Sequence, residues 1–217
     1  MRMRSRLDPL ARLLQARGLF YYRRARVVRC DALDIDSGDP RNGVEVQEAS
    51  EEDFHRLAAM LNERAAEWPG RRAKGMVCLV ARSGPVPLGY LWITRSPEVM
   101  TEVDHVIDVS RDAAGAYMFD GYVLPAHRRK GVLRTLLGSS KRWAAQRGVS
   151  RLYSAFAREN KVSEHALLTA GFVTVVGDVG ILRLLGREWK WVRLPHGGSI
   201  FDILGADGPS QIRPRSA

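Results

Sequence analysis

Residues 122–137 form a basic, glycine-containing turn whose composition suits the binding of a phosphate. The segment reads YVLPAHRRKGVLRTLL, in which an apolar strand passes through Pro125 into the turn and then into a helix that begins near Gly131. Backbone N–H groups at a helix N-terminus have no intrahelical partner, and the helix dipole favours an anion there. The segment therefore predicts a pyrophosphate cradle, with an ordinary solvated turn as the alternative.

A second segment downstream narrows the ligand. Residues 158–172 read RENKVSEHALLTAGF, in which Asn160 precedes a helix that ends at Gly171 and Phe172. In order and spacing, the two segments together resemble the Gcn5-related N-acetyltransferase (GNAT) superfamily, over roughly residues 43–194. The resemblance implies that the donor substrate is acetyl-CoA or another acyl-CoA.

The same resemblance implies which residues bind the donor. Main-chain groups of the strand that ends at Val123 would pair with the pantetheine arm, and Gly121 would allow a close approach or mark a bulge. Asn160 would hydrogen-bond the pantetheine, although it also suits a plain helix N-cap. The expected CoA-binding residues are Val123, Arg128, Arg129, Lys130, Gly131, Val132, Leu133, Arg134 and Asn160.

Two residues depart from the family pattern. Leu133 stands where the family usually has Gly or Ala, which affects how closely the helix approaches the pyrophosphate. Leu167 stands where many members have a tyrosine that is thought to reprotonate the CoA thiolate. Neither change opposes the fold, because leucine is a good helix former.

The proton acceptor for an attacking amine is expected on the central strand. Asp120 is the first candidate, because a carboxylate inside an apolar strand is costly unless it is used or paired. Pairing with a nearby arginine is the alternative. Tyr122, or else Tyr117, could replace the missing tyrosine as proton donor, although strand tyrosines more often pack. Further candidates for the acceptor side are Glu102, Asp104, His105 and Asp108.

The net charge of +10 is concentrated at the N-terminus. Residues 1–29 contain nine arginines and one acid, Asp8. A solvated basic N-terminal segment is the default explanation of such a run of arginines. Docking on a membrane surface through residues 1–29 is an alternative, because Leu7, Leu10, Leu13 and Leu14 could form one face of a helix from Asp8. A transit peptide is a minor alternative, since serine is scarce. Beyond the charge, nothing indicates nucleic acid binding.

The cysteines and histidines give no support for a metal site. Cys30 and Cys78 lie far apart, without metal-ligand spacing, and the five histidines are scattered. No apolar run approaches the roughly 18 residues of a membrane helix. We therefore expect a metal-free, cytoplasmic protein with reduced cysteines.

The pattern of elements predicts an α/β fold with a mixed, mostly antiparallel GNAT-like sheet flanked by helices. Strands are expected at 20–29, 44–47, 76–82, 88–94, 117–124, 151–156, 172–176 and 189–194, and helices from Ser50, Gly131 and Val162. Residues 96–115 give no clear prediction. We expect an Arg-rich extension and linker at 1–43, an acyltransferase domain at 44–194 and a disordered tail at 195–217. Exposed closing strands are compatible with a homodimer.

The expected function is transfer of an acyl group from a CoA thioester to the amine of a small molecule or amino sugar. Acetyl is the expected group. The amine would attack the thioester directly, in a ternary complex. A protein amine as acceptor, or an aminoacyl donor, is an alternative within the enzyme class. Outside the enzymes, the chain could be a binding module: a degenerate acyl-CoA sensor that docks through its basic N-terminal segment.

Overall fold

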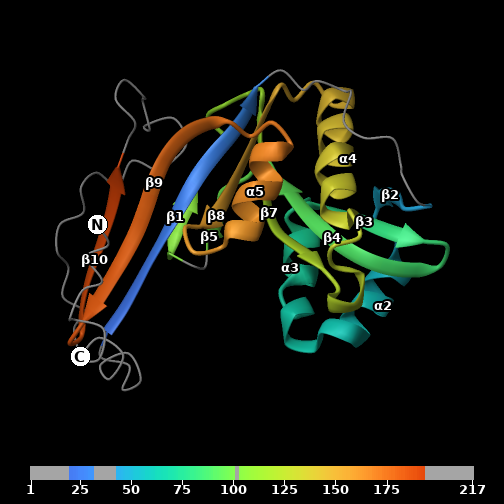
Figure 1. The fold of residues 1–217 in the computed structure, drawn as a ribbon, viewed down its shortest axis with the longest axis horizontal. Coiled ribbons are helices and arrows are strands. Elements are labelled where there is room, and N and C mark those ends of the chain that lie inside the picture. The colour runs from blue at the N-terminus through green and yellow to red at the C-terminus, as the bar shows by residue number, and fades with distance from the viewer. Residues whose placement is uncertain (1–19, 32–42, 101–102, 194–217) are drawn as a thin grey trace.

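The computed structural model describes residues 20–31, 43–100 and 103–193, which form a mixed α/β fold (Figure 1). The described strands are β1 (Phe20–Asp31), β2 (Glu45–Glu48), β3 (Val77–Ser83), β4 (Val86–Thr94), β5 (Glu98–Met100), β6 (His105–Ile107), β7 (Gly115–Val123), β8 (Arg151–Ala157), β9 (Thr174–Leu184) and β10 (Arg187–Arg193). The described helices are α2 (Glu51–Leu61), α3 (Trp68–Ala73), α4 (Val132–Gln146) and α5 (Lys161–Thr169), with the 3-10 turns η1 (Asn62–Ala65) and η2 (Pro125–His127). The helix expected from Asp8 and the expected C-terminal tail lie outside the described residues.

One large sheet organises the described residues. Its strand order is β10-β9-β1-β8-β7-β4-β3-β2. Every neighbouring pair is antiparallel except β7 and β8, which are parallel and are connected through α4. This arrangement confirms the predicted mostly antiparallel sheet, and it confirms β8 as the parallel neighbour of the central strand.

Helices and a hairpin cover the two faces of the sheet. On one face, α4 and α5 pack through Leu136 and Leu167, which are buried in the largest core cluster together with Phe172, just after α5. On the other face, α2 and α3 pack through Leu57 and Trp68. The hairpin β5–β6 covers that second face beside β1 and β9. None of the described helices is long and apolar enough to span a membrane.

Three elements differ from the sequence-based expectations. The strand expected in the N-terminal extension is β1, and it lies inside the sheet, between β8 and β9. Residues 96–115 contain β5 and β6, which at three residues each are too short for a periodic signal. The strand expected at 172–176 is the 11-residue β9, whose glycines at 177 and 180 obscured its length.

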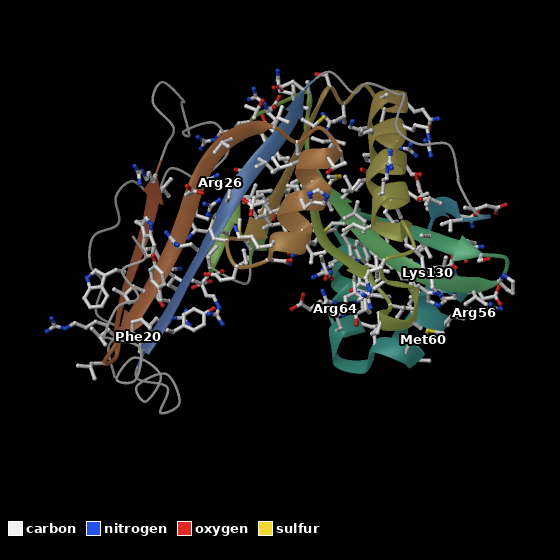
Figure 2. All side chains as sticks on the ribbon, viewed as in Figure 1. Phe20, Arg26, Arg56, Met60, Arg64 and Lys130 are labelled. Atoms are coloured by element: carbon white, nitrogen blue, oxygen red, sulfur yellow. The ribbon has the colours of Figure 1, made fainter. Side chains whose placement is uncertain are left out.

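The sheet is longer than the layer of helices that covers it. Figure 2 shows Phe20 at one end of the molecule and Arg56 and Met60 toward the other, with Arg26 and Arg64 nearer the middle. Lys130 lies close to the second group, in the turn that precedes α4. The candidate site lies between these ends, at the centre of the sheet.

Candidate active site

The candidate site lies where the parallel strands β7 and β8 separate. They stop pairing after Met118 and Ser154, where the Ser154 hydroxyl donates to the Met118 carbonyl over 3.3 Å. Beyond this point β7 continues beside β4 as far as Val123, whereas β8 continues beside β1 as far as Ala157. The described edge of β7 at residues 119–123 therefore has no strand partner on the β8 side. We call this gap the β7–β8 opening.

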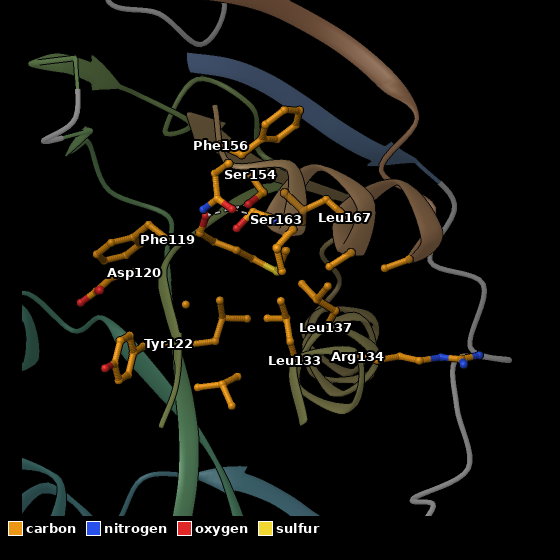
Figure 3. A pocket seen from close by; sticks show the side chains of 18 of the residues that line it. Phe119, Asp120, Tyr122, Leu133, Arg134, Leu137, Ser154, Phe156, Ser163 and Leu167 are labelled. Carbon is orange, nitrogen blue, oxygen red and sulfur yellow. Dashed lines mark hydrogen bonds between the residues drawn. The ribbon is translucent and has the colours of Figure 1, made fainter. Parts of the chain in front are cut away.

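A cavity of about 1860 Å³ extends through the β7–β8 opening. The ends of both strands, the turn before α4, and the facing sides of α4 and α5 line it. Figure 3 shows Asp120 and Tyr122 on one side of β7, and the apolar side chains of Leu133, Leu137 and Leu167 on the other. The cavity thus joins a polar part beside α2 and α3 to an apolar part between α4 and α5.

The turn before α4 presents backbone amides to the cavity. Arg129 and Gly131 both have positive φ, of 61° and 82°. Gly131 occupies the N-cap position of α4, and no side chain among the described residues caps the helix. The amides of the first helical turn therefore have no intrahelical acceptor and remain free to bind an anion. Gly131, Val132, Leu133 and Arg134 all line the cavity.

The basic side chains of the turn are arranged differently from one another. Arg128 lines the cavity, donates from Nε to the Val123 carbonyl over 3.2 Å, and lies 5.6 Å from the centre of the Tyr122 ring. Arg129 also lines the cavity, whereas Lys130 does not. Figure 3 shows the Arg134 side chain extending away from the leucines. Of the four basic residues at 128–130 and 134, three therefore line the cavity.

Asn160 lines the cavity and caps α5. Its side-chain oxygen accepts a hydrogen bond from the Ser163 amide over 3.1 Å. The N-cap alternative is therefore present in the structure. The cap uses the carbonyl oxygen alone, so the two N–H groups of the Asn160 side chain remain as donors toward a ligand.

A β-bulge interrupts β7 beside the opening. Tyr122 pairs with Tyr90 and Phe119 pairs with Trp92, so two residues, Asp120 and Gly121, face one residue of β4. Asp120 has φ of 45° at this bulge. A bulge turns main-chain groups out of the regular ladder. The prediction that Gly121 marks such a position agrees with this geometry.

The Asp120 carboxylate is held by two arginines. Its Oδ1 accepts from Arg64 over 2.5 Å, and its Oδ2 accepts from Arg71 over 2.6 Å. Tyr90 lies 3.4 Å from Oδ1 and accepts from Arg64 Nε over 2.7 Å. Burial raises the pKa of Tyr90, and the charge of Asp120 raises it further, so this hydroxyl stays neutral. The structure thus shows the arginine pairing that the sequence left open as the alternative for Asp120.

The two candidate tyrosines occupy different environments. Tyr122 is half-buried, lines the cavity, and packs against the guanidinium of Arg64 at 4.5 Å. Tyr117 also lines the cavity, but it is buried and its ring stacks on Phe119 at 5.7 Å. Tyr122 is therefore the better placed of the two to reach a ligand.

The other polar candidates lie away from the cavity. Asp104 pairs with Lys190 over 2.7 Å, and Asp108 accepts from the Ser110 hydroxyl. His105 is partly buried, and this burial lowers its pKa. These three residues do not line the cavity, and Glu102 lies outside the described residues. Across the described part of the chain, no group of three or more His, Cys, Asp or Glu side chains could hold a metal ion.

The two positions that depart from the family pattern have apolar surroundings. Leu167 is buried in the core between α4 and α5, and Leu133 is half-buried and packs against the same core. Both line the cavity. The α4–α5 side of the cavity therefore has an apolar wall at these two positions.

Several residues of the site have no signal in the sequence. Arg64 and Arg71 come from η1 and α3, which precede Asp120 by 56 and 49 residues and carry no recognisable motif. Ser154 lies in the middle of an ordinary strand, at the point where the opening begins. Local sequence could not show that these residues meet.

Comparisons with known proteins agree with this geometry. The Acetyltransferase (GNAT) family matches residues 43–172. A conserved protein of unknown function from Staphylococcus epidermidis has a similar structure, with 15% identity, a TM-score of 0.53, and coverage of 79% of this chain and 66% of that one. A Drosophila protein gives 14% identity, a TM-score of 0.50, and coverage of 87% and 57%. This chain thus spans about two thirds or less of these two relatives.

A structure of AAC(6')-Iy with the bisubstrate analogue CoA-S-monomethyl-acetylneamine is also similar, with 14% identity, a TM-score of 0.47, and coverage of 60% of this chain and 91% of that one. No curated protein matches the sequence significantly. The family match covers more than half of the chain and contains the β7–β8 opening, the turn before α4 and the cap of α5. The chain therefore belongs to the GNAT acetyltransferase family.

Proposed function

We propose that the protein transfers an acyl group, with acetyl as the expected group, from a CoA thioester to the amine of a small molecule. The observation that carries this proposal is the β7–β8 opening, because it joins an uncapped helix N-terminus to a polar chamber on the opposite side of the sheet. One substrate can enter from each side and meet beside the bulge at Asp120 and Gly121.

The α4–α5 side suits the donor. The free amides of the first turn of α4 would bind the pyrophosphate, and the unpaired edge of β7 would pair with the pantetheine arm. Asn160 would donate from its side-chain amide to the same arm while its oxygen caps α5. Holding the thioester beside the amine supplies much of the acceleration available to this kind of reaction.

The bulge supplies the groups for chemistry. The amine nitrogen attacks the thioester carbon, and a main-chain amide at Gly121 would stabilise the negative charge that develops on the oxygen. Asp120 would receive the proton that the amine loses. Tyr122 would donate a proton to the departing CoA thiolate, in the place of the tyrosine that Leu167 replaces.

The α2–α3 side suits an amine acceptor. Asp120 and Glu67 line the cavity there together with Arg64 and Arg71, which balance their charge, so the carboxylates would act on an acceptor amine by direct contact. Arg64 and Arg71 keep Asp120 in place by its two oxygens, so the carboxylate is fixed at the end of the opening.

Release of CoA from acetyl-CoA over a panel of small amines tests the proposal, together with thermal unfolding in the presence of acetyl-CoA. We expect acetyl-CoA to raise the melting temperature and at least one amine to accelerate thiol release. Stabilisation without turnover on any amine would favour an acyl-CoA sensor. Absence of both stabilisation and turnover would refute the transferase and the sensor alike.

A further inference from the structure

The sheet extends beyond the helices as a three-stranded arm. β1 pairs with β8 only from Ala25 onward, so residues 20–24 pair with β9 alone. β10 adds a third strand along the far edge of β9. We call residues 20–24, 180–184 and 187–191 the arm (Figure 1). All of it lies outside residues 43–172, which match the family.

One face of the arm is covered. Val179 and Ile181 of β9 are buried in the cluster that includes Ile107 of the hairpin β5–β6. Asp104, at the end of the same hairpin, pairs with Lys190 over 2.7 Å and approaches Arg183 at 3.5 Å. Hydrophobic packing and ion pairs thus hold the hairpin against this face.

The opposite face of the arm has no described element on it. Directly paired residues of neighbouring strands point to the same face of a sheet. Even-numbered residues of β1 share the side of Val28 and Cys30, which pack into the α4–α5 core. On this side the arm carries the rows Phe20–Leu184–Arg187, Tyr22–Leu182–Trp189 and Arg24–Gly180–Trp191, and the row Arg26–Asp178–Arg193 follows at its base.

Aromatic side chains form a platform on this open face. Trp191 lies over Gly180 so closely that a Cβ there would clash with its ring. Tyr22 stacks on Trp191 with 5.6 Å between ring centres, and the Arg24 guanidinium lies 5.6 Å from the centre of Tyr22. Gly180 is therefore the position at which the sheet accommodates the indole.

The charges around the platform are positive. Arg24, Arg187 and Arg193 are exposed, whereas the acid on these rows, Asp178, pairs with Arg26 over 2.8 Å. Residues 1–19, which lead directly into β1, add five arginines against Asp8. The tip of the β9–β10 hairpin exposes an apolar side chain, because Leu185 is 65% exposed.

We propose that the open face of the arm docks the protein on an anionic lipid bilayer. Tryptophan and tyrosine rings suit the headgroup level of a bilayer, and leucines suit the boundary with the acyl chains. Each arginine near an anionic leaflet adds electrostatic attraction. The face combines these residue types, with Leu185 at the tip, aromatic rings in the middle and arginines around them.

Two other occupants fit this face less well. Phe20, Leu182 and Leu184 give a nucleic acid little to recognise, although the tyrosine and tryptophan could stack on bases. A second copy of the chain, joined by a two-fold axis through this face, would bring the same patch of arginines against itself. An anionic membrane matches both the apolar and the basic side chains.

The first experiment measures binding of the full chain to vesicles of phosphatidylcholine with 30% phosphatidylglycerol, and to vesicles of phosphatidylcholine alone. The double variant Arg24→Glu/Arg193→Glu should bind the anionic vesicles at least about tenfold more weakly than the wild type. The control Arg56→Glu/Lys74→Glu makes the same charge change at the other end of the molecule, on α2 and next to α3, and should bind as the wild type does. If the control variant lost as much binding to anionic vesicles as Arg24→Glu/Arg193→Glu does, the proposal would be overturned.

The second experiment identifies the inserted residues. Lipids with brominated acyl chains quench tryptophans that enter the bilayer. Trp68, Trp92 and Trp143 are buried, with 2%, 0% and 9% exposure, so quenching should report Trp189 and Trp191. The conservative variant Trp189→Phe/Trp191→Phe should lose the quenching and keep the melting temperature of the wild type within a few degrees.

Three further results would overturn the proposal. The first is absence of binding to anionic vesicles by the folded wild type. The second is vesicle binding without quenching by brominated lipid, because the arm would then not insert. The third is binding to a single-stranded oligonucleotide that is lost in Arg24→Glu/Arg193→Glu, without any binding to vesicles, which would assign the face to nucleic acid instead.

Discussion

The carboxylate of Asp120 and the guanidinium of Arg71 form a largely buried ion pair of 2.6 Å, with side-chain exposures of 13% and 11%. Arg71 also pairs with Glu67 over 2.9 Å, and Asp120 also pairs with Arg64. This network fixes Asp120 at a bulge where its backbone has a positive φ. The proposed proton acceptor is therefore also a structural centre of the α2–α3 side, and the two roles require separate measurements.

The variant Asp120→Asn should lower the free energy of unfolding by about 2 to 3 kcal/mol. Breaking a buried ion pair leaves the partner charge uncompensated, which costs roughly 3 to 5 kcal/mol, and the Asn oxygen and Glu67 recover part of this loss. Urea unfolding measures the change. The variant Arg64→Gln removes the second pair of the same carboxylate and should cost less than about 1 kcal/mol, because Arg64 is 45% exposed. Equal losses in the two variants would contradict the prediction.

The variant Asp120→Asn should also lower kcat, and this effect is measured separately from the loss of stability. If Asp120 accepts the proton, Asp120→Asn should lower kcat by roughly 10²- to 10⁴-fold. Arg64→Gln keeps the carboxylate and should lower kcat much less. A purely structural Asp120 would instead give a lower melting temperature with a kcat near that of the wild type at a temperature where both proteins are folded.

The variant Gly131→Ala should weaken the binding of acetyl-CoA by about tenfold. Gly131 has φ of 82° and open space around its Cα, so the added methyl group clashes with nothing but strains the backbone by roughly 1 to 2 kcal/mol. Relief of this strain would turn the amides of the first turn of α4. Calorimetric titration with acetyl-CoA measures the change.

Lys130→Ala is the matched control for the turn. Lys130 does not line the cavity, so its removal should weaken binding less than threefold, by loss of long-range attraction alone. A larger effect in Lys130→Ala than in Gly131→Ala would show that side-chain charge, and not backbone conformation, holds the donor.

Local sequence signals predicted the elements around the donor side. The strand, basic turn and helix at residues 115–146 and the capped helix at 161–169 agree with the expectation, because turn glycines, caps and apolar periodicity act within a few residues. The parallel pairing of β7 and β8 followed from the helix between them. The match with the family confirms the fold that these segments predicted.

The acceptor side was not predictable in the same way. Arg71 lies 49 residues before Asp120, and their contact depends on how α3 packs against the sheet through Trp68. The strands β5 and β6 are too short to show a period of two, and the placement of β1 inside the sheet depends on its pairing with β9 far along the chain. Such long-range contacts leave no local pattern in one sequence.

Variants of Asn160 should separate its two roles. Asn160→Ala removes the cap on the Ser163 amide and should cost about 1 kcal/mol of stability, whereas Asn160→Ser keeps a capping oxygen and should cost a few tenths. If the side-chain amide of Asn160 binds pantetheine, both variants should weaken acetyl-CoA binding alike. Weaker binding in Asn160→Ala alone would assign the residue to the cap. Urea unfolding and calorimetric titration of the same preparations give both readouts.

Asp112 should contribute to stability at neutral pH and lose this contribution in acid. Its carboxylate is buried and accepts from Arg151 over 2.6 Å, from the Tyr153 hydroxyl over 2.7 Å and from the Ala114 amide over 3.1 Å. The hydrogen bond from Arg151, aided by those from Tyr153 and Ala114, lowers the pKa of Asp112. A lowered pKa in the folded state gives stability that is present above the unfolded value, roughly 3.9, and is lost as the pH falls through the folded value.

The variant Asp112→Asn should therefore be less stable than the wild type at pH 7 and should show a shallower fall in the free energy of unfolding between about pH 5 and pH 3. Asp178→Asn is the comparison, because the pKa of Asp178 is also lowered, chiefly by its hydrogen bond from Arg26, but in an ion pair that is 27% exposed on both sides. Asp178→Asn should therefore also lower the free energy of unfolding at pH 7, but by less than Asp112→Asn does. Parallel curves for Asp112→Asn and the wild type over this range would show that the carboxylate is not stabilised as an anion in the fold.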